Sequence, residues 1–436
     1  MTISTKLMKA SVVVAIFASF MLQGCIKDKC DLTYTHAKYT PVYMSLEDFH
    51  NAVSIEGPRE IANPGKIYVK DDYLFVSEIA KGVHVIDNQN PSNPVSLAFI
   101  NAPGNYDISF NCDKLYIDSS TDLLVFDMTN PAKPVFVERV QNALPHIVEY
   151  NGYFADASQG VVVEWIQEIV EEEYSCETGV PPLWVDNQID PSTVNMLDGS
   201  TSRTINPATP GKGGSMSRFA LTDDYLYIVT PKQLLVYDAA NCTEHPSRIT
   251  IHDLELWGGA AEMVFTMNDL LMIGSTSSMM IYSLSNPENP EFLSNFQHVN
   301  SCDPVTSDGT FAFVTLRNGP NDPCGGGWNN QLDVLNIENP RNPYLVSSFP
   351  MTEPAGLGLD GNMLFIADGP AGLRVFDASN PANVGNKSIA HFSEMQGFDV
   401  IPNDGVLIMV GEDGIVQYDY ADPKNITKLS TIPVVN

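Results

Sequence analysis

The chain repeats one pattern of apolar runs and tight polar turns. Tyr73-Leu-Phe-Val76 follows Asp71-Asp72, and Met363-Leu-Phe-Ile366 follows Asp360-Gly361. Turns of this kind accept the positive φ angles that two-residue hairpins need, and short apolar runs between such turns are typical of antiparallel strands. Similar runs occur at residues 115–117, 225–229, 270–273, 311–314 and 406–410. The pattern therefore predicts hairpins along most of the chain.

Each predicted hairpin leads to a strand that ends at a proline turn. The strand at 82–87 is followed by Asn90-Pro91, and similar Asn-Pro turns stand at Asn286-Pro287 and Asn339-Pro340. Proline has no N–H for a strand ladder and keeps the preceding residue extended, so the turn closes the strand. One more extended segment follows, such as 292–296. Each repeat therefore predicts four antiparallel strands.

The repeat decides the fold class. The position of Asp87, which ends the strand before the proline turn, recurs in the other repeats at Asp127, Trp165, Asp238, Ser283, Asn336, Asp377 and Asp419. A period of about 40–45 residues with four strands indicates a β-propeller, whereas solenoid repeats are usually shorter or contain helices. We predict an all-β propeller of four-stranded antiparallel blades, eight by direct count, or seven if the degenerate third unit, Gly152 to Trp165, is absorbed elsewhere. Only residues 165–174 suggest a helix.

The repeat also resembles a known family. Gly-Leu-Arg-Val-Phe-Asp-Ala-Ser-Asn-Pro at 372–381 is similar to the LVIVD repeat of bacterial and archaeal surface proteins, and segments 82–94, 123–134 and 279–290 extend the likeness over most of residues 65–435. The resemblance implies a β-propeller displayed outside the cell, with no general biochemical activity attached. Tryptophan–aspartate repeat propellers match less well, because no Gly-His…Trp-Asp pair recurs.

The amino terminus predicts export. Lys6 and Lys9 precede an apolar stretch at 10–22 that is too short for a comfortable membrane span. The stretch ends in Leu22-Gln-Gly-Cys25, which resembles a bacterial lipobox and implies cleavage before Cys25 and lipid attachment there; the alternative is an ordinary signal peptide. Ile26 is not the Asp of inner-membrane retention. We therefore expect a lipid anchor in the outer membrane, with the protein at the cell surface or on the periplasmic face.

These features predict three regions. Residues 1–24 form a signal peptide, 25–64 a tether and lead-in segment, and 65–436 a propeller with insertions at about 168–216 and 318–330. Long irregular loops in compact domains are usually functional or disordered. Trp184 and Trp328, one in each insertion, are therefore candidate ligand contacts, and the alternative is that both insertions are plain surface loops.

The charge balance excludes one class of partner. There are 23 Lys and Arg residues against 53 Asp and Glu residues, a net charge of −30. Such a chain repels nucleic acid, so we expect no nucleic-acid partner. The excess of acid could attract cations or basic partners, but a well-hydrated surface explains it more simply.

Six cysteines besides Cys25 remain, an even number that permits disulfides in an exported chain. The best candidate pair is Cys302–Cys324, which would tie the second insertion to its base; Cys176–Cys242 is a weaker candidate. No cysteine has the C-x-x-C spacing of a zinc or redox site.

No catalytic signature is present. The histidines lack metal-binding spacing, the turn acids are explained by turn chemistry, and no calcium loop occurs, so we assign no catalytic residue, no metal and no cofactor. His146 could face the central channel, although a structural role explains it better. Two functions stay open: a surface module that binds a protein or glycan, and a glycan hydrolase or lyase with its acids in the channel. We favour the first, and a channel lined by apolar and small residues would argue against the second.

Overall fold

The structure is a computed structural model that describes residues 31–146, 148–150, 153–175, 212–214, 217–222, 224–240, 246–256, 260–298, 304–317, 330–412 and 414–435. The chain divides into two compact units, residues 1–38 with 167–197, and residues 39–166 with 198–436. The second unit is the larger of the two.

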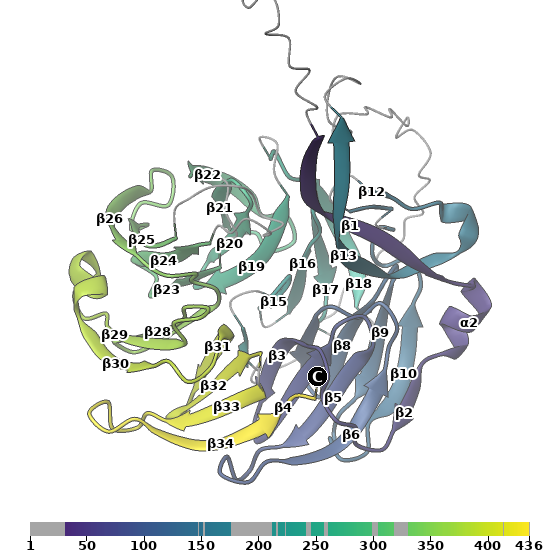
Figure 1. Ribbon diagram of the computed structural model, residues 1–436, viewed down its shortest axis with the longest axis horizontal. Helices are drawn as coiled ribbons and strands as arrows, with labels where there is room; N and C mark the ends of the chain where they lie inside the picture. The colour runs from purple at the N-terminus through teal and green to yellow at the C-terminus, as the bar shows by residue number, and fades with distance from the viewer. Residues whose placement is uncertain are drawn as a thin grey trace, which may run out of the picture. The chain divides into compact units, whose positions relative to one another are not determined.

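The larger unit is a seven-bladed β-propeller, and each blade is a four-stranded antiparallel sheet whose strands follow chain order (Figure 1). Blade 1 comprises β3 (Pro64–Lys70), β4 (Tyr73–Glu78), β5 (Gly82–Asp87) and β6 (Val95–Asn101), and blade 2 comprises β7 (Ile108–Asn111), β8 (Lys114–Ser119), β9 (Asp122–Asp127) and β10 (Val135–Val140). Blade 3 comprises β15 (Phe219–Leu221), β16 (Tyr225–Val229), β17 (Gln233–Asp238) and β18 (Ser247–Asp253); blade 4 comprises β19 (Ala261–Met267), β20 (Leu270–Ser275), β21 (Ser278–Ser283) and β22 (Glu291–Gln297); and blade 5 comprises β23 (Val305–Ser307), β24 (Phe311–Leu316), β25 (Gln331–Asn336) and β26 (Tyr344–Pro350). Blade 6 comprises β27 (Leu357–Asp360), β28 (Met363–Ala367), β29 (Leu373–Asp377) and β30 (Ser388–Phe392), and blade 7 comprises β31 (Gly397–Asn403), β32 (Val406–Gly411), β33 (Gly414–Asp419) and β34 (Thr427–Pro433).

The predicted hairpins form where the sequence places them. Asp71, Asn268, Gly361 and Asp404 open the turns between the first two strands of their blades with φ between 47° and 53°. Aspartate, asparagine and glycine tolerate this left-handed conformation better than other residues do. The apolar runs that follow these turns form the second strand of each blade, and these central strands are almost entirely buried.

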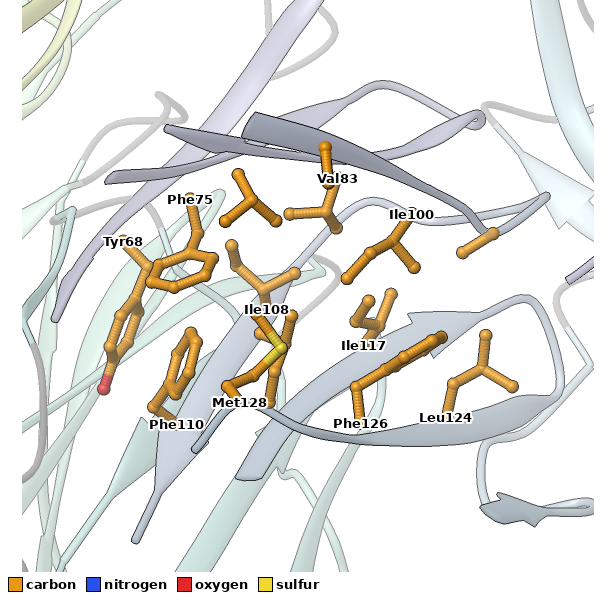
Figure 2. Close-up of a cluster of buried hydrophobic side chains, with 14 residues drawn as sticks. Tyr68, Phe75, Val83, Ile100, Ile108, Phe110, Ile117, Leu124, Phe126 and Met128 are labelled. Atoms are coloured by element: carbon orange, nitrogen blue, oxygen red, sulfur yellow. The ribbon is translucent and has the colours of Figure 1, made fainter. Parts of the chain in front are cut away.

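Neighbouring blades bury their apolar faces against one another. Between blades 1 and 2, Phe75 of β4 and Phe110 of β7 have ring centroids 4.3 Å apart, and Ile100 of β6 joins the same buried cluster as Ile117 of β8 (Figure 2). Similar clusters join blades 7 and 1, blades 3 and 4, and blades 4 and 5. The core is therefore a ring of inter-blade layers, which explains why the central strands are apolar on both faces.

The Asn-Pro turns hold adjacent blades together. Ser294 of β22 donates a hydrogen bond to the Pro340 carbonyl of blade 5 at 2.5 Å, and Thr250 of β18 donates one to the Glu288 carbonyl of blade 4 at 2.9 Å. Both hydroxyls stand beside a bulge in the outermost strand. The turn thus closes its own blade and also accepts a bond from the preceding one.

The same contact closes the ring between blades 7 and 1. Ser430 of β34 donates to the Pro91 carbonyl at 2.6 Å, and the side-chain amides of Asn88 and Gln417 bond each other at 2.7 and 2.9 Å. Ile61, just before blade 1, forms a parallel bridge with Val434. Chain segments from the two ends of the propeller therefore lie side by side (Figure 1).

The preferred count of eight blades is wrong, and the seven-blade alternative holds. Around the Trp165 unit the described residues form only a two-stranded sheet of β11 (Glu149–Tyr150) and β12 (Tyr153–Phe154), a 3-10 turn η1 (Ala157–Gln159), and β13 (Val161–Ser175), which pairs with β1 (Asp31–Met44). Blades 2 and 3 share one buried cluster, with Tyr116 and Val125 packed beside Leu226 and Tyr237, so no blade separates them.

The residues of the absorbed unit pack elsewhere. Val161 and Val163 of β13 bury against Phe49 of helix α2 (Leu46–Asn51), whose N-cap Ser45 accepts a bond from Asp48 N. The helix suggested at 165–174 is also wrong, because these residues continue β13. The β-branched residues and the partner strand β1 outweigh the helical spacing that suggested it.

Two short strands extend blade 1. At its outer edge β2 (Ser54–Glu56) pairs with β6, and at its inner edge β14 (Lys212–Gly213) pairs with β3. The chain that follows β14 leads to the start of blade 3. Among the described residues, no helix has the length and apolar character needed to cross a membrane.

Candidate functional site

A cavity of about 220 Å³ lies between blades 2 and 3, where the repeat is interrupted. We call it the seam cavity. Its walls come from the loop before β7, from the ends of β8 and β16, from the segment at 144–165, and from the residues that open blade 3. Its polar and aromatic lining residues are Tyr106, Asp118, Ser120, Tyr150, Glu164, Trp165, Arg218, Phe219 and Thr230.

Asp118 organises one wall of the seam cavity. Its Oδ1 accepts hydrogen bonds from Asn105 Nδ2 at 2.9 Å, Tyr106 N at 2.7 Å and Asp107 N at 2.8 Å. Its Oδ2 pairs with Arg218 Nη2 at 2.8 Å. Four donors on one buried carboxylate fix the loop before β7 and hold the guanidinium of a residue 100 positions away.

Arg218 stands directly before β15, the first strand of blade 3, and both its backbone and its side chain are held by other residues. Its backbone N–H donates a short hydrogen bond to Asp107 Oδ2, and the hydroxyl of Ser217 also reaches the Asp107 carboxylate at 3.1 Å. Its guanidinium lies 5.7 Å from the ring centroid of Tyr106, within the range of a cation–π contact. The Arg218 side chain keeps 26% of its surface exposed, so part of the guanidinium faces the cavity.

Part of the cavity lining is aromatic. Tyr150 and Trp165 stack with centroids 5.9 Å apart and an interplanar angle of 24°. Tyr39 contacts Tyr150 edge-on at 5.1 Å and Tyr153 at 5.7 Å, which braces the hairpin of β11 and β12. Tyr150 lies in this hairpin and Trp165 in β13, and their stacked rings give the cavity an aromatic surface.

Glu164 and its neighbours complete the rim. Glu164 Oε2 pairs with Lys81 Nζ of blade 1 at 2.7 Å. The backbone of Val162 is held on both sides, because its carbonyl accepts from Ser120 Oγ at 2.7 Å and its N–H donates to His146 Nε2 at 3.4 Å. His146 therefore supports β13, and burial lowers its pKa.

Burial sets the protonation of the cavity walls. It raises the pKa of Asp118 to about 6, against the opposing effects of Arg218 and of the backbone N–H bonds. It also raises the pKa of Tyr106 to about 12 and shifts that of Tyr150 upward. Both phenols are therefore neutral at pH 7 and can donate hydrogen bonds.

A second cavity, of about 340 Å³, lies in the central channel. The innermost strands of all seven blades line it with apolar, small and hydroxyl side chains, such as Ser109, Ala220, Val264 and Thr306, and its lining contains no Asp, Glu, His, Lys or Arg. A lining of apolar and small residues is the one that, from the sequence, we expected to argue against an enzyme with its acids in the channel.

Charged residues gather at the end of the channel instead. Lys66, Asp107, Arg218 and Asp399 occupy equivalent positions at the start of the innermost strands of blades 1, 2, 3 and 7. Burial lowers the pKa of Lys66, against the attraction of Asp107 and Asp399. A Cβ on Gly214 or Gly356 would lie 1.9 Å from an oxygen of Asp399, so both glycines give that carboxylate its space.

The structure leaves every site residue predicted from the sequence untested. Cys25, Trp184, Cys302, Cys324 and Trp328 all lie outside the described residues, as do Cys176 and Cys242. Cys112 is disulfide-bonded. Within the described ranges no cluster of three or more His, Cys, Asp or Glu side chains could hold a metal ion.

Sequence reasoning missed the seam cavity residues except Trp165, which it marked as the place where the repeat fails. Tyr106, Asp118 and Arg218 stand directly beside apolar runs that form buried strands. A charged residue next to an apolar run that must be buried could have indicated this site, because a buried charge needs a partner.

Comparisons with known proteins agree with the fold. Residues 63–100, 107–142 and 356–390 match the LVIVD repeat, and they cover most of blades 1 and 2 and much of blade 6. A search of curated proteins found no match.

Solved structures with similar folds include the periplasmic gluconolactonase PpgL of Pseudomonas aeruginosa (TM-score 0.54, 10% identity, 84% of this chain and 96% of that chain) and a protein from Lactobacillus plantarum (TM-score 0.54, 11% identity, 85% and 97%). At such identities the likeness concerns the fold alone.

Proposed function

Because the chain is a seven-bladed β-propeller that carries LVIVD repeats, we propose that it is a lipid-anchored binding module outside the cytoplasm, which holds the end of a glycan in the seam cavity. The observation that carries the ligand class is the pairing of the Tyr150–Trp165 stack with Arg218 and Glu164 across one small cavity. Sugars present an apolar C–H face and a rim of hydroxyls, which such a cavity complements.

The anchor rests on the amino terminus. A charged start, a short apolar stretch and Leu22-Gln-Gly-Cys25 stand in the order of a lipoprotein signal. Cys25 would carry the lipid and hold the propeller at the outer membrane, on the surface or on the periplasmic face. The Cys25→Ala substitution should move the protein from the membrane pellet to the soluble fraction of the cell envelope. A variant that still pellets with the membrane would contradict the proposed lipid anchor.

Binding is tested on the purified chain that begins after Cys25, with a glycan array followed by calorimetry on the retained oligosaccharides. Trp165→Ala should weaken binding at least tenfold, since removing an aromatic anchor typically costs more than about 1.4 kcal/mol. Tyr344→Ala, which removes a 55% exposed ring from the outer strand of blade 5, is the matched control and should leave the affinity unchanged. Retention of no glycan at all would refute the proposal.

One observation favours the enzymatic alternative, a glycan hydrolase or lyase. Asp118 and Glu164 line the same cavity, and the pKa of Asp118, at about 6, would suit a general acid. However, both Asp118 oxygens already accept hydrogen bonds, four in total, and this arrangement stabilises a fixed carboxylate. Incubating each bound oligosaccharide with the protein and finding cleavage that Glu164→Gln abolishes would favour the enzyme over the binding module.

A further inference from the structure

The polar groups of the seam cavity are already partly used. Arg218 uses Nη2 to pair with Asp118, and Glu164 uses Oε2 to pair with Lys81. The Arg218 guanidinium also lies over the Tyr106 ring. Among the described residues, Asp118 and Lys81 are the only side chains that form a hydrogen bond or ion pair with the Arg218 guanidinium and with the Glu164 carboxylate, respectively. The Nε and Nη1 groups of Arg218 and one acceptor oxygen, Glu164 Oε1, are therefore left for a ligand.

A donor and an acceptor in the lining of one small cavity can match two hydroxyls of a sugar. The guanidinium can donate a hydrogen bond to one sugar hydroxyl, and Glu164 can accept a hydrogen bond from another. The phenols of Tyr106 and Tyr150 are neutral and have no intramolecular hydrogen-bond partner within the described residues, so they can bond further hydroxyls. Trp165 and Tyr150 supply the flat surface for the C–H face of the ring.

The charges of the walls disfavour an acidic ligand. Two carboxylates and one guanidinium line the cavity, and the guanidinium is already neutralised by Asp118. Lys81, the partner of Glu164, is 52% exposed and therefore weak as a counter-charge. The chain as a whole carries a net charge of −30, which adds to the repulsion of anions.

The size of the cavity limits how much of a ligand it encloses. Its volume of about 220 Å³ is below the roughly 300–1,000 Å³ of pockets that enclose drug-sized molecules. The cavity therefore suits one ring, with the rest of a chain outside it.

We propose that the seam cavity is specific for an uncharged pyranose, whose hydroxyls bridge Arg218 and Glu164, and that it rejects the uronic acid of the same sugar. This inference rests on the proposed glycan-binding function and adds the class of sugar. Like-charge contacts in a small site are costly, so the neutral form should bind at least tenfold more tightly.

The experiment uses an array that carries uronate-containing oligosaccharides beside their carboxyl-reduced forms, which have the same linkages without the charge. Retention of the reduced forms with rejection of the native uronates supports the inference. Equal or tighter binding of the native uronates overturns it and leaves the glycan-binding function standing. Retention of neither class overturns the glycan-binding function itself.

Two variants test the role of Glu164. Glu164→Gln removes the charge and keeps the shape and an acceptor oxygen, so it should reduce the preference for the neutral sugar over its uronate about tenfold. The affinity for the neutral sugar itself should fall, because an amide oxygen accepts a weaker hydrogen bond than a carboxylate does. Lys81→Met removes the counter-charge and should lower uronate affinity further. Both side chains are partly exposed, and unchanged thermal midpoints would show that both variants fold. Rejection of uronates by Glu164→Gln as strong as that of the wild type would contradict the inference.

Discussion

The seam between blades 2 and 3 differs from the seams that follow the repeat. At an ordinary seam, such as that of blades 4 and 5, an apolar layer, a hydroxyl-to-carbonyl bond from the outermost strand and an exposed ion pair join the blades. At the interrupted seam, Glu138 stands at the position that Ser294 holds in blade 4, and buried charges link blade 2 to blade 3. The interrupted seam also contains the cavity.

The difference shows what the repeat does. Where the repeat is intact, the polar features described above complete a turn or join two blades. Where it is interrupted, the connecting segment brings in Tyr150, Glu164 and Trp165, and blade 3 begins with Arg218. The propeller thus provides the frame, and the proposed ligand site lies in its irregular part, as is common for sites carried by loops on a scaffold.

Removing one charge from each kind of seam should produce the largest difference in stability between them. Asp118→Ala leaves Arg218 and three N–H groups without their buried acceptor, so the free energy of unfolding should fall by about 3–5 kcal/mol. Glu291→Ala, the control, removes an ion pair between blades 4 and 5 whose side chains are 58% and 59% exposed. It should cost less than about 1 kcal/mol. Urea denaturation measures both, and equal losses would show that the two seams do not differ in this way.

A smaller effect is expected from the hydroxyls of the ordinary seams. Ser430→Ala removes the bond to Pro91 that helps to close the ring, and Ser294→Ala removes the bond to Pro340. Each should cost about 1 kcal/mol, the net value of one hydrogen bond.

Ser347 provides a matched control for these two serines. It holds the equivalent position in blade 5, but its hydroxyl has no hydrogen-bond partner. Ser347→Ala should leave the urea midpoint unchanged or raise it slightly, because no bond is lost. A loss as large as that of Ser294→Ala would mean that packing, and not the bond to the turn, accounts for the effect.

The sequence predicted the frame far better than the site. Turns such as Asp71-Asp72 and Asn90-Pro91 act through neighbouring residues, so their spacing was enough to predict four-stranded blades. The predicted number of blades was one too high because Trp165 lies close to the expected spacing of the repeat. In the structure, however, Val161 and Val163 pack on Phe49, over 100 residues earlier in the chain. Sequence spacing does not report such a distant partner.

The site depends on contacts that are still less local. Asp118 and Arg218 are 100 residues apart, and the long segment between them includes the interrupted unit. Periodicity places each residue at a strand end but does not show that the two ends meet. The indole rings of Trp184 and Trp328 drew attention because they stand in insertions, and the polar residues at the strand ends were overlooked.

The smallest expected effect is a change of ligand affinity with pH, confined to the interrupted seam. The pKa of Asp118 is raised to about 6, so its charge is lost as the pH falls below this value, and Arg218 loses the anion that positions it. Affinity should therefore fall about threefold to fivefold between pH 7 and pH 5. Over the same window the folded protein takes up a proton that the unfolded chain does not, since an ordinary Asp titrates near pH 3.9.

This proton uptake makes the contribution of Asp118 to the free energy of unfolding rise as the pH falls from about 6 to about 4. Affinity and stability thus change in opposite directions through this one group, which separates its titration from acid unfolding. Calorimetry from pH 5 to pH 7 on the wild type and on Asp118→Asn measures the effect. The variant should bind more weakly, with no change across the range. A wild-type affinity that is also constant would mean that the charge of Asp118 does not position Arg218 for the ligand. The cavity at this seam would then depend on side-chain packing alone.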